Sequence, residues 1–136
     1  MIGLLLSLVM AIVCILLHFE ALMLVQRLRE RMDGHRTVMI AMWMILLTVH
    51  VLQVWLFAIA YVLGCHWQLG ELVEVDGFLD YVYFSAIVYT TVGFGDIVPT
   101  GDLRMLAACE GLVGLCLIAW SATATFGIFS RWSDGR

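Results

Sequence analysis

Residues 90–96 read TTVGFGD, and they carry the one pattern in this chain that points to a defined chemistry. A cation that has lost its hydration water needs a cage of oxygens, and rings of backbone carbonyls provide one where several chains meet around an axis. Consecutive carbonyls turn to one side when left-handed and right-handed backbone conformations alternate, and the left-handed ones cost least for glycine. Gly93 and Gly95 stand at alternate positions, and the Thr91 hydroxyl adds a further oxygen. The pattern predicts a cation site rather than a glycine turn at a helix end, because a turn needs neither the paired threonines nor the aspartate.

The composition is that of a membrane protein, since 63% of the 136 residues are hydrophobic and only 13% are charged. Residues 3–25, 37–63 and 103–130 are apolar stretches, each long enough to cross about 30 Å of hydrocarbon as a helix. Residues 78–89 are apolar and aromatic but too short to span, which is typical of a re-entrant helix surrounded by protein. The sequence shows no nucleophile with a base, phosphate-binding loop or metal-ligand cluster, so we expect no enzyme, no cofactor and no nucleic-acid partner.

Basic residues predict how the chain is oriented in the membrane. The segment after the first span carries Arg27, Arg29, Arg31 and Arg36 against Glu30 and Asp33, and the tail after the third span carries Arg131 and Arg136 against Asp134. Both segments are expected in the cytoplasm, which puts the amino terminus outside, and we expect the plasma membrane. A voltage sensor is the competing interpretation of the first arginines. Sensor arginines recur every third residue within a span, whereas these alternate after it.

Residues 90–96, with the aromatic helix before them and a span on each side, resemble the selectivity filter of tetrameric potassium channels. The resemblance covers residues 37–131 and is to the pore-only branch of that family, with one additional helix at the amino end. It implies a homotetramer in membrane lipids that passes K+ passively through a four-fold backbone filter. The residues that it implies for ion binding are Thr91, Val92, Gly93, Phe94 and Gly95, with K+ at the first four.

The expected fold is an all-α membrane protein with three transmembrane helices, a re-entrant pore helix and a filter loop. Residues 1–36 hold the additional helix and a cytoplasmic linker, and residues 37–136 hold the pore domain. Within the pore domain we expect an outer helix at 37–63, an outer loop at 64–77, the pore helix at 78–89, the filter at 90–96 and the inner helix at 103–130.

Several residues are expected to support the filter, and they are Thr90, Asp96, Tyr83, Phe84 and Glu110. By resemblance, Phe84 stands where an indole donor to Asp96 would be usual, and Ile87 stands where some members carry a glutamate. Asp96 is therefore expected to lack two partners. Phe94 replaces the usual tyrosine of the filter, which removes a hydroxyl bond to the pore helix and puts the rigidity of the filter in doubt.

Glu110 lies within the third span, where a carboxylate is costly and by default functional. We expect it to support the filter from behind. The alternative is an ion pair with Arg104 near the outer interface, but six residues are a poor spacing for a pair on one helix.

A gate or hinge is expected on the same helix. Gly111 and Gly114 permit close helix crossing, and a glycine here resembles the hinge of such channels, although Leu115 aligns with the hinge position itself. Phe126 and Phe129 lie three residues apart toward the cytoplasm, where the inner helices of four subunits would converge. There their side chains would form a hydrophobic constriction that closes the pore by excluding water.

Other polar residues leave alternatives open. His50 and Gln53 are polar near mid-depth of the second span, and we favour helix-to-helix hydrogen bonds over proton sensing. His18 and Glu20 are expected to reach the inner interface with their side chains. Cys65 is expected to be a free thiol rather than half of an inter-subunit disulfide.

Acidic residues are expected to gather outside the membrane, and they are Glu71, Glu74, Asp76, Asp80, Asp96 and Asp102. Such a vestibule would concentrate cations at the mouth of a pore, although ordinary solvation of loops explains any single acid equally well. Two further functions remain compatible with the sequence, a weakly selective cation channel and a non-conducting subunit of another channel.

Overall fold

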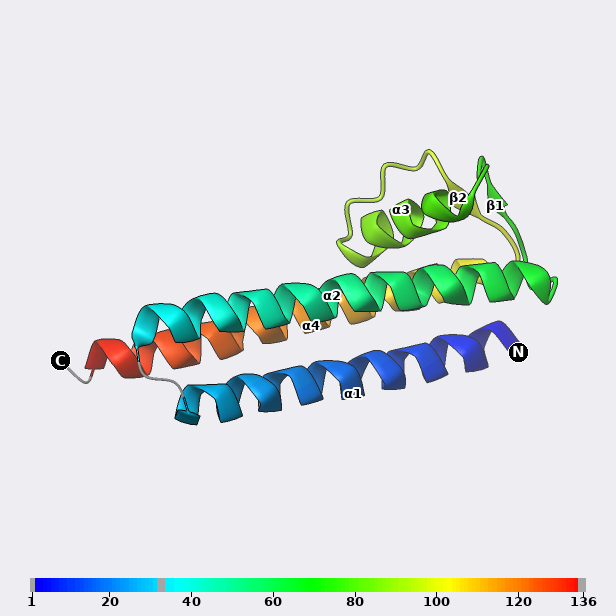
Figure 1. Cartoon of the computed structure of the whole chain (residues 1–136). Helices are drawn as coiled ribbons and strands as arrows, with labels where there is room; N and C mark the ends of the chain where they lie inside the picture. The colour runs from blue at the N-terminus through cyan, green and yellow to red at the C-terminus, as the bar shows by residue number, and fades with distance from the viewer. Residues whose placement is uncertain (1, 32–33, 135–136) are drawn as a thin grey trace.

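Three long helices and one short helix make up nearly all of the structure. The computed structural model describes residues 2–31 and 34–134, with the side chains of residue 35 and of residues 131–134 left aside. The elements follow in the order α1 (Ile2–Arg31), α2 (His35–His66), β1 (Leu72–Val73), α3 (Phe78–Tyr89), β2 (Val98–Pro99) and α4 (Leu103–Asp134). In Figure 1 the three long helices run side by side, and α3 lies against α2 and α4 on the face opposite α1.

The long helices form because apolar residues occupy nearly every position, and helical hydrogen bonds satisfy the backbone that lipid cannot. Three helices of the described chain are long and apolar enough to cross a membrane: Ile2–Arg31, Arg36–His66 and Leu103–Ser130. The protein is an integral membrane protein with three candidate spans. Helix α3 has 12 residues, about 18 Å at 1.5 Å per residue, and cannot span.

Helix α2 continues beyond the apolar range expected for the outer helix and ends at His66. The backbone N–H of Trp67 still donates to the carbonyl of Leu63, at 2.9 Å. The helical ladder extends past the last apolar turn because its bonds do not depend on apolar side chains.

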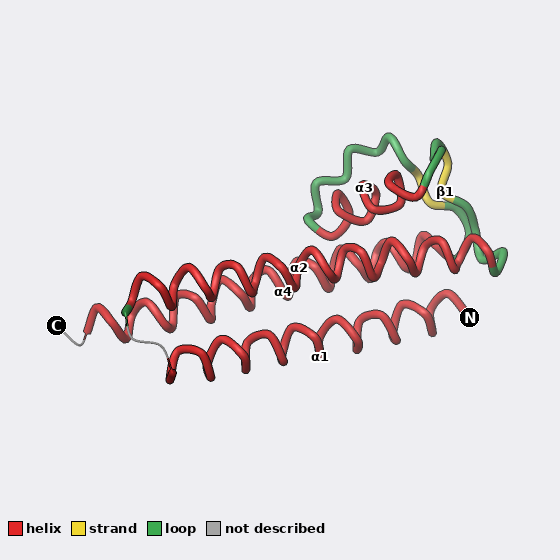
Figure 2. The backbone as a smooth tube through the Cα atoms, in the orientation of Figure 1, coloured by secondary structure: helices red, strands yellow, loops and turns green. Residues whose placement is uncertain are grey.

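Two short strands were not expected from the sequence. β1 and β2 pair antiparallel, with Leu72 opposite Pro99 and Val73 opposite Val98 (Figure 2). Next to them, the Thr100 hydroxyl accepts from the backbone N–H of Glu71 at 2.8 Å. The strand pair and this hydrogen bond connect the segment after residues 90–96 to the outer loop. Strands of two residues are too short to show the alternation by which strands are recognised.

Asp80 holds the beginning of α3 in place. Its Oδ2 accepts from the backbone N–H groups of Asp76 and Gly77, at 2.8 and 3.0 Å. These N–H groups have no partner within the helix, and a carboxylate there also faces the positive end of the helix dipole. Asp80 therefore has a structural role in capping α3, besides its place among the outer acids.

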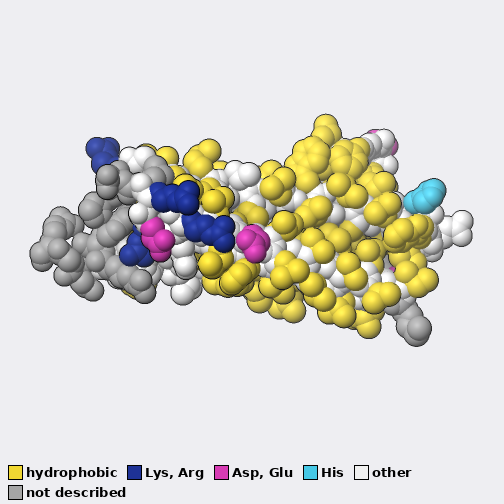
Figure 3. Space-filling view, turned by 60° about the horizontal axis from the view of Figure 1, so that its bottom comes forward, with side chains coloured by type: hydrophobic (Ala, Val, Ile, Leu, Met, Phe, Trp, Pro, Cys, Tyr) yellow, Lys and Arg dark blue, Asp and Glu magenta, His cyan; other side chains and the backbone are white. Residues whose placement is uncertain are grey.

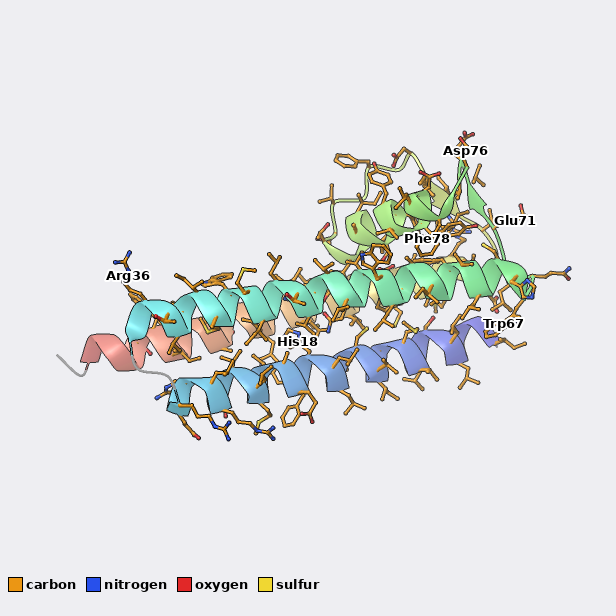
Figure 4. All side chains as sticks on the ribbon, viewed as in Figure 1. His18, Arg36, Trp67, Glu71, Asp76 and Phe78 are labelled. Atoms are coloured by element: carbon orange, nitrogen blue, oxygen red, sulfur yellow. The ribbon has the colours of Figure 1, made fainter. Side chains whose placement is uncertain are left out.

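The surface of the single chain is largely apolar. Hydrophobic side chains cover most of the face shown in Figure 3, and basic side chains gather toward the end where α1 finishes with Arg29 and Arg31. Arg36 lies at that end of α2, and Glu71 and Asp76 lie at the opposite end of the molecule (Figure 4). Asp33 and Arg136 fall outside the described residues, as do the side chains of Arg131 and Asp134.

At Gly114, α4 packs against the end of α3 without room for a side chain. A Cβ built at Gly114 would collide with the carbonyl group of Tyr89 and lie 3.0 Å from its ring carbon Cγ. At Gly111 the nearest atom is the Val88 carbonyl oxygen at 3.5 Å, and at Gly127 nothing lies within 4 Å among the described residues. The absence of a side chain at position 114 is therefore required by packing.

We expect Gly114→Ala to destabilise the folded protein by at least about 1–3 kcal/mol, because backbone atoms of α3 must shift. Thermal unfolding of the purified protein in detergent measures this loss. Gly111→Ala and Gly127→Ala are matched controls that should be tolerated, since alanine is the better helix former and space is present. Unchanged stability of Gly114→Ala combined with a loss of channel opening would instead favour the hinge role.

Candidate functional site

The backbone of residues 91–95 alternates in handedness. Thr91, Gly93 and Gly95 have φ angles of 60°, 53° and 81°, while Val92 and Phe94 between them are not among the residues with positive φ. This is the alternation that turns successive carbonyls to one side. A Cβ at either glycine would meet nothing within 4 Å in the described chain, so backbone conformation alone accounts for glycine here.

Thr91 is the strained member of this segment. It is a β-branched residue with a left-handed φ, which costs of order 1–3 kcal/mol and persists only where the surroundings impose it. Such strain gathers at sites where geometry serves a function. The sequence pattern assigned the left-handed positions to the two glycines and did not include Thr91.

Three hydrogen bonds tie this segment to the end of α3. The backbone N–H groups of Thr90, Thr91 and Gly93 donate to the carbonyls of Ala86, Val88 and Ile87, at 3.1, 2.9 and 3.0 Å. The Thr90 hydroxyl also donates to the Ala86 carbonyl, at 2.7 Å. The last carbonyls of α3 and the first N–H groups of the segment therefore satisfy each other at a depth where lipid offers no partner.

Asp96 has a partner on α3 that the sequence did not predict, at a position other than the two where the family's usual partners are missing. The Tyr83 hydroxyl donates to Asp96 Oδ2 at 2.7 Å. This bond to a carboxylate raises the pKa of Tyr83. The sequence placed Tyr83 among the residues expected to support the filter but did not predict its bond to Asp96. Phe84 is buried between helices instead, with its ring edge-on to Tyr61 of α2 at 5.0 Å between centroids.

Glu110 is fully buried and joins three helices. Its Oε2 accepts from the Tyr61 hydroxyl of α2 and its Oε1 from the Ser85 hydroxyl of α3, both at 2.5 Å. The Ser85 hydroxyl also lies 2.8 Å from the carbonyl of Val54. Arg104 is exposed, so the structure does not bring it to Glu110 as the alternative required. Glu110 therefore contacts the pore helix at Ser85 and does not take the place of a partner for Asp96.

A second polar group lies deeper and was only partly anticipated. We call it the buried hydrogen-bond chain, and it consists of His18, Ser121, His50, Tyr89, Gln53 and the carbonyl of Cys14. His50 and Gln53 form helix-to-helix bonds, as expected. His18 was expected at the interface, and this was wrong: it is 0% exposed and faces α2 and α4 (Figure 4). The sequence did not indicate that Tyr89 and Ser121 take part in this group, since each residue type is common in apolar helices.

The candidate gate residues are not brought together within one chain. Phe126 and Phe129 are exposed on α4, so their convergence depends on further copies and stays a prediction. Gly111 lies against Val88 of α3 and Gly114 against Tyr89. All four cysteines are free thiols within the single chain, and an inter-subunit disulfide at Cys65 stays untested.

A short helix that lies against two spans and ends in a strained backbone segment is the arrangement of a membrane pore. The family described as "Ion channel" matches residues 44–131, which is more than half of the chain. The chain belongs to this ion channel family and is not an enzyme.

Two relatives are named potassium channels. The inward rectifier potassium channel Kirbac3.1 of Paramagnetospirillum magnetotacticum is 33% identical over 84 residues, covering 59% of this chain and 27% of the relative. Two pore potassium channel a of Oryza sativa subsp. japonica is 43% identical over 42 residues, covering 30% of this chain and 12% of the relative. The chain thus spans well under half the length of either relative. No solved structure matches it significantly. The resemblance to potassium channels that the TTVGFGD motif carried is confirmed.

We expect Glu110→Gln to alter open probability or inactivation without changing which ion permeates. The amide keeps the shape of the carboxylate but has one accepting oxygen instead of two, so either Tyr61 loses its acceptor, at a cost of about 1–3 kcal/mol, or Ser85 keeps only the Val54 carbonyl. Single-channel recording of purified protein between about pH 5 and pH 8 measures the effect. Glu20→Gln, at an exposed carboxylate of α1, is the matched control.

Phe126→Ala separates this support role from an inner gate. If the constriction at Phe126 is the gate, that variant raises the leak current and leaves filter behaviour alone. If Glu110→Gln behaves like the wild type and Phe126→Ala opens the channel, the support role of Glu110 is wrong. Gating at the crossing of the inner helices then takes its place.

Proposed function

We propose that the protein is a potassium-selective channel that conducts K+ passively through a filter of backbone carbonyls at residues 91–95. The observation that carries this proposal is the alternation of φ along the segment, with left-handed Thr91, Gly93 and Gly95. Val92 and Phe94 have exposed side chains in the single chain, as expected of a segment completed by other subunits. Two relatives named potassium channels support the choice of ion.

The filter requires a homotetramer. One copy of residues 91–95 cannot surround an ion, and carbonyl rings of the potassium-channel type use four copies. Three candidate spans in each of four subunits give twelve membrane-crossing helices. Exposed apolar side chains along all three spans leave ample surface for contacts with lipid and with other subunits.

The amino terminus is proposed to lie outside and the carboxyl terminus in the cytoplasm. Arg27, Arg29 and Arg31 lie at the carboxyl end of α1, and Arg36 lies at the adjacent end of α2. Basic segments are retained on the cytoplasmic side of a membrane, which places these arginines in the cytoplasm and the amino end of α1 outside. Glu71 and Asp76, at the opposite end, then face the outside and attract cations to the mouth.

We expect purified protein in a planar bilayer to show a reversal potential set by K+ when K+ and Na+ face each other across the membrane. Native mass spectrometry should show a tetramer of the 15.3 kDa chain. Equal permeation of Na+ and K+ would make the protein a weakly selective cation channel. Current that appears only with a second channel protein would make it an assembly subunit. A stable dimer or trimer would contradict the four-fold filter.

Gly93→Ala and Gly95→Ala should each abolish selective conduction. A Cβ disfavours the left-handed backbone by roughly 1–2 kcal/mol per residue, and the cost recurs in every subunit. Reversal potentials under the same ionic conditions measure the loss. Gly127→Ala is the control, because Gly127 lies on α4 where a Cβ meets nothing within 4 Å in the part of the chain that the structure describes. Unchanged selectivity in either filter variant would count against the filter assignment.

A further inference from the structure

The buried hydrogen-bond chain begins and ends on α1 and passes through every other helix. His18 Nε2 of α1 lies 3.2 Å from Ser121 Oγ of α4, which lies 3.0 Å from His50 Nε2 of α2. His50 Nδ1 lies 2.8 Å from the Tyr89 hydroxyl of α3. That hydroxyl donates to Gln53 Oε1 at 2.5 Å, and Gln53 Nε2 donates to the carbonyl of Cys14 at 3.0 Å. Cys14 and His18 are one helical turn apart, so α1 holds both ends.

The chemistry of the groups fixes the direction of every bond from Gln53 to His50. The Cys14 carbonyl only accepts, so the amide nitrogen of Gln53 must face it and Gln53 Oε1 must face Tyr89. The single proton of the Tyr89 hydroxyl is therefore donated to Gln53. The hydroxyl oxygen then accepts from His50, which must carry its proton on Nδ1.

The same reasoning continues to His18. Neutral His50 has a bare Nε2, which accepts the proton of the Ser121 hydroxyl. The Ser121 oxygen consequently accepts from His18 Nε2–H. His18 Nδ1 is left as a bare acceptor, and it is the one buried side-chain nitrogen or oxygen without a hydrogen-bond partner among the described residues. Every other bond in the chain is satisfied when both histidines are neutral.

The chain acts on the residue next to the filter. Tyr89 is the last residue of α3, its side chain is held by His50 and Gln53, and its carbonyl lies against Gly114. Thr90 and Thr91 follow directly, and their backbone N–H groups are bonded to the last turn of α3. A displacement of the Tyr89 side chain is therefore transmitted to the first ion-binding position through one residue.

We propose that α1 supports the filter through this chain, with Tyr89 as the positioning residue and neutral His18 as the condition for support. The proposal rests on the proposed channel function and identifies how the filter is regulated. It assigns a role to the helix that the ion channel family match, residues 44–131, does not cover.

Protonation of His18 opposes this arrangement. A second proton on its ring goes to Nδ1, which creates a buried cationic N–H with no acceptor in the described part of the chain. The groups that face the ring are the His50 imidazole of α2 at 5.2 Å, the Trp120 ring of α4 at 5.5 Å and the Ser121 hydroxyl. From α3 only Tyr89 enters the chain, and Glu110 of α4 is bonded to Tyr61 and Ser85 instead. A buried neutral histidine must charge as pH falls, so filter support is present at neutral pH and lost in acid.

Tyr89→Phe and His18→Leu each break the chain at one link, in α3 and in α1. We expect His18→Leu to lower the ratio of conducting to non-conducting channels about fivefold, the effect of one hydrogen bond of ordinary strength, with the reversal potential unchanged. Tyr89→Phe removes two bonds of the chain and should lower the ratio at least as much. The double variant should lose no more than Tyr89→Phe alone, because one broken link already uncouples α1 from Tyr89. Thr48→Ala is the control, since among the described residues its hydroxyl bonds the Met44 carbonyl of its own helix alone, at 2.7 Å.

His18→Gln distinguishes positioning from general stability. The glutamine amide can donate to Ser121 as His18 Nε2 does but takes up no proton, so this variant should conduct like the wild type at neutral pH and decline less steeply in acid, where His50 is the one histidine left in the chain. Additive losses in the double variant, or a wild-type pH profile in His18→Gln, would overturn the proposal.

A readout that does not need conduction separates this proposal from the channel function. The melting temperature of the detergent-solubilised protein should decline in acid for the wild type and less steeply for His18→Gln, and it should show the same non-additivity for Tyr89→Phe and His18→Leu. A wild-type protein without potassium selectivity would contradict the proposed function, while the melting temperatures would still decide whether the chain couples α1 to α3.

Discussion

The structure depends on how the polar backbone at the end of α3 is satisfied inside an apolar protein. A 12-residue helix cannot cross the membrane, so its last carbonyls and the segment that follows lie where lipid offers no hydrogen bonds. The carbonyls of Ala86, Ile87 and Val88 accept from N–H groups of residues 90–93, so the residues that follow α3 satisfy its last turn. The left-handed backbone of Thr91 persists because these bonds and the packing of α3 against α2 and α4 hold it.

Two polar layers hold α3 from behind, and they differ in chemistry. In the outer layer Glu110 accepts hydrogen bonds from the hydroxyls of Tyr61 and Ser85 and so connects α4, α2 and α3 around one carboxylate. In the inner layer the buried hydrogen-bond chain connects all four helices through neutral groups. A carboxylate that loses one hydroxyl donor still accepts from the other. Each hydroxyl in the chain has a single proton to donate, so one bond cannot reverse its direction unless the neighbouring bonds reverse as well.

Helix α1 is integrated into the bundle at both ends and in the middle. Near its amino end the backbone N–H of Gly3 donates to Asp102 Oδ2 at 3.2 Å, which brings a carboxylate to the positive end of the helix dipole. At mid-depth Cys14 and His18 bond to α2 and α4. Toward the inner end Leu22 and Val25 pack with Met42, Leu46 and Ile128. These contacts pack α1 against α2 and α4 along its length.

The sequence by itself determined the features that depend on neighbouring residues. Apolar length defines the three spans, and glycines two positions apart define where a left-handed backbone is cheap, since both properties are local. The tertiary structure alone decided which polar residues meet. Ser85 and Glu110 are 25 residues apart, Tyr61 and Glu110 are 49 apart, and His18 and Ser121 are 103 apart.

Such partners come together only through the relative rotation and depth of packed helices, and these follow from the fit of whole helix surfaces. This is why the sequence placed His18 at the membrane interface and did not predict which residue bonds Asp96, while packing buries the imidazole at 0% exposure and brings the Tyr83 hydroxyl to Asp96. A polar residue in an apolar helix indicates that the folded protein supplies it with a hydrogen-bond partner. Only the packed structure shows which partner it finds.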